Sequence, residues 1–162
     1  MKTAKALIAL VVLGCLFTFS NCGGGGGTPE PLANQQFTKL AGSSSKTWKL
    51  TAVTLDDKPQ FTPSGSYNNN FTLTISGTKG ATSFDYAVAG RPPLSPWKAG
   101  GKWFFGADVA TQIVRDPDLT ADKLDMTYSV ADNTLQLQFN YQGAGFTRVD
   151  QVKGNWVFTF GL

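Results

Sequence analysis

Apolar and polar residues alternate with a period of two along most of the chain. The clearest segment, "LQLQFNY" over residues 135–141, places Leu135, Leu137, Phe139 and Tyr141 against Gln136, Gln138 and Asn140. Strict alternation is typical of an antiparallel strand with one buried face. Residues 71–76, 84–88, 126–130 and 156–160 show the same pattern.

Three less regular apolar runs, which begin at Thr47, Lys102 and Val109, bring the predicted strands to eight. In the first run the apolar phase slips at Ala52-Val53, as it does at a β-bulge. A tight hairpin turn is expected at Asp132-Asn133, and a short helix over Asn34–Gly42 that ends at the glycine. The sequence therefore predicts an all-β fold, a small antiparallel eight-stranded meander barrel, with a β-sandwich as the alternative.

The first two dozen residues follow a different pattern. Met1–Lys5 carries two lysines, and residues 6–19 form an apolar stretch that is shorter than the roughly 18 residues of a membrane-spanning helix. This is the pattern of a secretory signal. The leader contains two cysteines: Cys15 lies within the apolar stretch, and Cys22 lies just after it. The segment "GGGGGTPEP" comes directly after Cys22.

A secretory leader that ends at a cysteine resembles a bacterial lipoprotein signal. The resemblance implies that the cysteine becomes the N-terminus and carries acyl chains such as palmitate. Cys22 is preferred because the glycines behind it supply a flexible spacer, with Cys15 as the alternative and an unlipidated secretory signal as a third reading. We expect a signal peptide over 1–21, a lipidated cysteine and Gly/Pro tether over 22–34, and one domain over 35–162.

Residues 40–59, "LAGSSSKTWKLTAVTLDDKP", resemble the start of the lipocalin-like domains found in lipoproteins of the Bacteroidota. The resemblance implies a calycin-like barrel with a short N-terminal helix and Trp48 on the first strand. Lipocalins also stack an arginine on that tryptophan, and Arg148 is the nearest candidate. A ligand cavity does not follow, because a small eight-stranded barrel can be filled by its own side chains.

Composition excludes several function classes. Without Lys2 and Lys5, the 14 basic residues fall to 12, scattered singly, against 11 acidic residues, so no nucleic-acid partner is expected. The expected domain contains no His, Cys or Glu. Nucleophilic catalysis of the Ser-His or Cys-His kind and an ordinary zinc site therefore lack their residues. We expect a non-catalytic protein without a cofactor or metal.

One acidic stretch leaves calcium binding open. Asp116, Asp118, Thr120 and Asp122 fall at every second position, which is the ligand spacing of a calcium loop. Ala121 stands where that loop needs glycine, and Thr127 where it needs glutamate.

Three tryptophans are the candidate ligand-binding residues: Trp97, Trp103 and Trp48. Trp97 lies in an unusual loop, "GRPPLSPWKAGGKW", over residues 90–103. Its aromatics could contact a carbohydrate or a protein. The favoured interpretation is a packed lid over the barrel mouth with Trp97 as its plug.

These features predict a lipid-anchored protein of the cell envelope, placed at the outer membrane because Gly23 supplies no inner-membrane retention signal. The predicted role is a binding module for a small apolar ligand or a glycan. The alternative is a structural or assembly lipoprotein that contacts another envelope protein. A solvent-connected cavity inside the barrel would favour ligand binding, and a filled barrel would favour the structural role.

Overall fold

The computed structural model describes residues 28–120, 122–143 and 152–162. Cys15, Cys22, the glycines of the tether and Arg148 lie outside the described residues, so the predictions made for them stay predictions. No helix within the described ranges is long and apolar enough to cross a bilayer.

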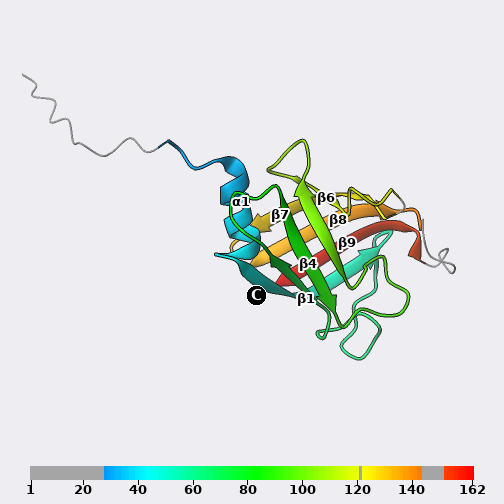
Figure 1. Cartoon of the computed structure of the whole chain (residues 1–162). Coiled ribbons are helices and arrows are strands. Elements are labelled where there is room, and N and C mark those ends of the chain that lie inside the picture. The colour runs from blue at the N-terminus through cyan, green and yellow to red at the C-terminus, as the bar shows by residue number, and fades with distance from the viewer. Residues whose placement is uncertain (1–27, 121, 144–151) are drawn as a thin grey trace, which may run out of the picture.

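Eight antiparallel strands form a closed barrel (Figure 1). Each strand pairs with the next along the chain, and β1 also pairs with β9, which closes the sheet on itself. This closure confirms the predicted barrel and removes the sandwich alternative. A ninth, two-residue strand, β2 (Lys58–Pro59), extends only the end of β1. The barrel strands are β1 (Ser45–Leu55), β3 (Thr72–Ser76), β4 (Ser83–Ala89), β5 (Gly100–Phe105), β6 (Gln112–Arg115), β7 (Leu124–Ala131), β8 (Thr134–Tyr141) and β9 (Gly154–Gly161).

The eight predicted strands correspond to the eight barrel strands. Two predicted local features, the irregularity in β1 and the hairpin turn, are also present. The register between β1 and β9 shifts between Leu50 and Ala52, next to the predicted bulge. Asp132 has a φ of 49° in the hairpin turn between β7 and β8, a conformation that asparagine and aspartate tolerate.

Several boundaries differ from the expectation, and those of β6 and of the helix have a clear local cause. Strand β6 begins at Gln112 rather than Val109, because Asp108 turns the chain: its carboxylate accepts hydrogen bonds from the Ala110 N–H (2.9 Å) and the Thr111 hydroxyl (2.7 Å). The same bonds lower the pKa of Asp108. The helix α1 (Leu32–Ala41) begins two residues before the expected Asn34, directly after Pro31.

The two ends of the barrel are covered differently. At one end, here called the helix end, α1 buries Phe37, Leu40 and Ala41, and the indole N–H of Trp48 donates to the Leu40 carbonyl at 2.9 Å. The opposite end, here called the loop end, carries the connections that follow β1, β4, β6 and β8.

Aromatic rings fill the space between the two ends. Inward-facing residues of successive strands are buried, and Phe71, Phe158 and Phe160 make ring contacts across the barrel with centroid separations of 5.8–6.2 Å. Side chains of the strands, of α1 and of the connections together make up the core.

Candidate functional site

The three candidate tryptophans are all fully buried. Trp48 lies at the helix end, whereas Trp97 reaches into the barrel from the loop between β4 and β5. The loop thus has the packed arrangement in which Trp97 plugs the barrel. A ligand-binding role for Trp48, Trp97 and Trp103 stays a prediction.

Rings and one cation surround Trp97. The centroids of Tyr86, Trp103, Phe139 and Phe158 lie 5.7–6.4 Å from its own, and the last two meet it edge to face. The guanidinium carbon of Arg115 lies 5.6 Å from the Trp97 ring centroid. Such a cation over an indole stabilises the pair when both are shielded from water.

Arg115 and Asp116 bring buried charge to the same place. Arg115 Nη1 donates to the Pro96 carbonyl at 2.8 Å, which holds the loop beside Trp97. Arg115 Nε lies 3.7 Å from Asp116 Oδ2. The Asp116 carboxylate also accepts from the Tyr86 hydroxyl (2.9 Å) and the Lys102 N–H (2.8 Å). Opposite charges and hydrogen bonds together compensate the burial of both side chains.

Lys98 lies between two residues of the calcium-like pattern. Its ammonium is 2.9 Å from Asp122 Oδ2 and 3.9 Å from Asp116 Oδ2. Asp116 is buried and takes part in the bonds just described, whereas Asp118 is exposed. Among the described residues, no three acidic side chains are placed together to hold a metal ion.

Burial raises the pKa values of two tyrosines at the loop end. It raises the pKa of Tyr67 to about 12, against a smaller lowering by the hydrogen bond to Ser95. Burial also raises the pKa of Tyr86, the charge of Arg115 partly lowers it, and the bond to Asp116 raises it again. Both hydroxyls are therefore neutral at physiological pH.

Four buried polar atoms have no hydrogen-bond partner among the described residues: Trp97 Nε1, Trp103 Nε1, Arg115 Nε and Tyr141 Oη. Trp103 and Arg115 face each other in the register between β5 and β6, and Arg115 lies over Trp97. Arg115 is also close enough to Tyr141 that its charge lowers the pKa of that hydroxyl, against the larger raising effect of burial. We call these four side chains the buried donor group.

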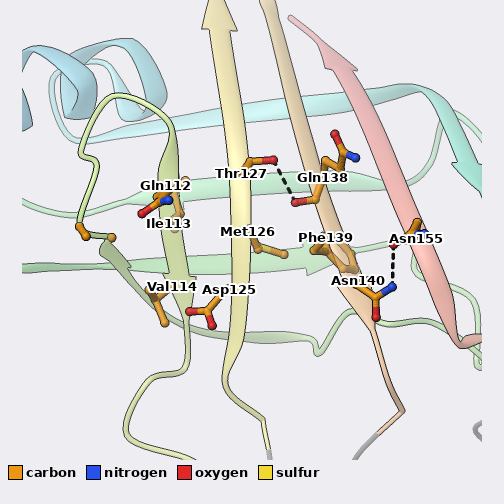
Figure 2. A pocket seen from close by; sticks show the side chains of 12 residues that line it. Gln112, Ile113, Val114, Asp125, Met126, Thr127, Gln138, Phe139, Asn140 and Asn155 are labelled. Carbon is orange, nitrogen blue, oxygen red and sulfur yellow. Dashed lines mark hydrogen bonds between the residues drawn. The ribbon is translucent and has the colours of Figure 1, made fainter.

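A cleft of about 720 Å³ lies on the wall of the barrel near this group. Figure 2 shows its lining residues, which come from β6, β7, β8 and β9 and from the connection between β5 and β6. Most are exposed and uncharged, and carboxamides are frequent: Gln112, Gln138, Asn140 and Asn155. Met126 and Phe139 are buried side chains that also belong to the core cluster.

The cleft forms where two neighbouring strands part. The register between β7 and β8 runs from Ala131↔Thr134 to Thr127↔Gln138. Beyond it, Leu124–Met126 continues to pair with β6, and Phe139–Tyr141 continues to pair with β9. In Figure 2 the side chain of Met126 points from β7 toward β8, and Phe139 lies at β8.

The lining of the cleft is polar, with Asp125 as the charged side chain among mostly uncharged ones. Asn140 and Asn155 are opposite each other on β8 and β9, and Asn140 Nδ2 donates to Asn155 Oδ1 at 2.6 Å. The carboxylate of Asp125 has the ammonium of Lys123 3.8 Å away. A carboxamide both donates and accepts hydrogen bonds, so such a surface can match hydroxyl groups of a ligand.

The sequence contained a signal for this cleft. The polar face of residues 134–142 carries Gln136, Gln138, Asn140 and Gln142, with no charged residue. Of these carboxamides, Gln138 and Asn140 line the cleft. Which strands lie beside it depends on the register, and the alternation alone does not determine that.

Comparisons with known proteins find no match. No family model, curated protein or solved structure matches the chain.

Proposed function

We propose that this protein is a lipid-anchored, non-catalytic module of the cell envelope that binds a neutral glycan in the cleft between β7 and β8. The observation that carries the proposal is the cleft itself, about 720 Å³ in volume and lined by four carboxamides. Its volume lies within the roughly 300–1,000 Å³ of ligand sites in proteins. Sugar hydroxyls both donate and accept, as carboxamides do.

The glycan is favoured over a small apolar ligand because of the core. Trp97 and the rings around it occupy the interior that an apolar ligand would need. The cleft offers an exposed surface of mixed polarity instead, with Met126 and Phe139 at its base.

The anchor is part of the proposal and has its own test. The leader pattern and the glycines after Cys22 support attachment at that residue. Mass spectrometry of the protein recovered from its cells should find Cys22 as the N-terminus with acyl mass on it. The Cys22→Ala variant should leave the membrane fraction, whereas Cys15→Ala should remain there. A mature N-terminus without acyl mass would contradict the anchor.

Electrophoresis of the full chain through gels that contain neutral polysaccharides tests the glycan. The Gln138→Ala/Asn140→Ala double variant should bind about tenfold more weakly than wild type, because it loses both of these hydrogen-bonding side chains. Asn69→Ala is the matched control, because Asn69 is an exposed carboxamide of the loop between β2 and β3. Equal migration of all three proteins with and without every polysaccharide would contradict the proposal.

A structural or assembly role is the second candidate, and the filled barrel interior favours it. In that case one envelope protein should copurify with the full chain in fixed ratio. The cleft variants should retain that partner as well as wild type does, and no polysaccharide should retard the chain.

A further inference from the structure

The base of the cleft is a thin part of the barrel wall. Strands β7 and β8 part beyond Thr127↔Gln138, so the strand hydrogen bonds that close the rest of the wall do not bridge Met126 and Phe139. These two side chains line the cleft outside and belong to the core inside (Figure 2). Methionine is unbranched and flexible, so it can move aside at low cost.

One member of the buried donor group, Trp97, lies directly behind this point. The Phe139 ring meets the Trp97 ring edge to face, with centroids 5.9 Å apart. Arg115 pairs with Leu124 at the β7 side of the parting, and Tyr141 ends β8 on the other side. Unpaired atoms of Trp97, Arg115 and Tyr141 are therefore found around the inner side of the gap.

The charge of this region is already balanced. Arg115 has Asp116 at 3.7 Å, and Lys98 has Asp122 at 2.9 Å. An anionic group would meet two carboxylates without a free cation to match it. The unpaired indole and guanidinium N–H groups are donors, so a neutral acceptor such as a carbonyl oxygen suits them best.

We propose that the glycan of the cleft contains an N-acetylated amino sugar whose acetamido group enters between Met126 and Phe139. This inference rests on the proposed function. The methyl group packs against these two side chains, and the carbonyl accepts a hydrogen bond from the buried donor group. The carboxamides Gln138 and Asn140 hold the hydroxyls of the same sugar outside.

Two probes of equal length separate this inference from glycan binding in general. Chitotetraose and cellotetraose share the β-1,4 linkage and differ in the acetamido group that replaces each 2-hydroxyl. The full chain should bind chitotetraose about tenfold more tightly, as expected when one buried donor gains its acceptor and a methyl group is buried. Equal affinity for the two probes would leave glycan binding intact and overturn the acetamido site. Binding of neither probe would overturn both.

The four indole N–H signals in NMR spectra report where the probe reaches. Chitotetraose should shift the signals of Trp97 or Trp103, whose N–H groups are unpaired among the described residues. Trp48 and Trp156 donate to the carbonyls of Leu40 and Val152 and should not shift. A shift of none of the four on binding would place the sugar outside the wall and refute the inference.

Tyr141→Phe tests the donor group with little risk to the fold, because it removes one hydroxyl that has no partner among the described residues. It should weaken chitotetraose binding severalfold and leave cellotetraose binding unchanged. Gln138→Ala should weaken both probes alike. If Tyr141→Phe affected both probes equally, the preference for the acetamido group would not come from this site.

Discussion

The two ends of the barrel cover the core in different ways. At the helix end, α1 covers the core, and the buried indole N–H of Trp48 has the Leu40 carbonyl as its partner. At the loop end, Trp97 enters from a connection, and buried charge from Arg115 and Asp116 holds that connection in place. Unpaired donors then remain beside Trp97.

This difference affects the stability of the two ends. Each unpaired buried donor lowers the free energy of unfolding by about 1–3 kcal/mol. This is a substantial part of the total, since the free energy of unfolding of a domain is about 5–15 kcal/mol. The indole N–H of Trp48 has its partner, so this tryptophan carries no such cost. The loop end holds the polar atoms that can still gain a partner, and the cleft lies against them.

The largest expected effect comes from the buried charges of the loop end. Asp116→Ala leaves Arg115 buried without its carboxylate and should lower the free energy of unfolding by about 3–5 kcal/mol. Denaturation by urea measures it. Asp85→Ala is the control, since Asp85 forms an exposed pair with Lys102 (2.6 Å) and should cost less than about 1 kcal/mol. Similar losses in both variants would show that the charges do not distinguish the loop end.

Alkaline pH gives the next largest effect. The pKa of Tyr67 is about 12 in the folded protein and about 10 when unfolded, so between these values the unfolded chain releases a proton that the folded chain keeps. The stability from Tyr67 is fully present below pH 10 and is lost as pH rises toward 12, by at most about 2–3 kcal/mol. Tyr67→Phe should flatten this part of the stability curve measured by urea denaturation. An unchanged slope would mean that Tyr67 ionises in the folded state as it does in solution.

Much of the fold could be predicted because alternation is local. Each inward residue of β8, from Leu135 to Tyr141, was assigned to its face by the period of two alone. The number of short strands and the lack of helical runs in the sequence predicted a barrel or a sandwich, and the pairing of β1 with β9 decides for the barrel. The start of β6 could not be placed, because a side chain, Asp108, turns the chain within an apolar run.

The candidate site was less predictable because it depends on pairing between strands. Alternation assigns Met126 and Phe139 to the interior, yet it does not reveal that β7 and β8 part beside them. Arg115 follows an apolar run and has nothing in its neighbourhood in the sequence to indicate burial. Its ion-pair partner Asp116 is the next residue, but the Pro96 carbonyl that accepts its hydrogen bond lies on the separate connection between β4 and β5.

The smallest predicted effect is the difference between the same substitution at the two ends of the barrel. Trp48→Phe and Trp97→Phe remove the same atoms from fully buried sites. The first also leaves the Leu40 carbonyl without its donor, so it should cost about 1–2 kcal/mol more than the second. Urea denaturation of both variants measures the difference, and Trp156→Phe should group with Trp48→Phe because its N–H donates to the Val152 carbonyl. If Trp97→Phe were as costly as Trp48→Phe, the Trp97 N–H would already have a partner in the folded protein, and the loop end would hold one donor fewer for a ligand.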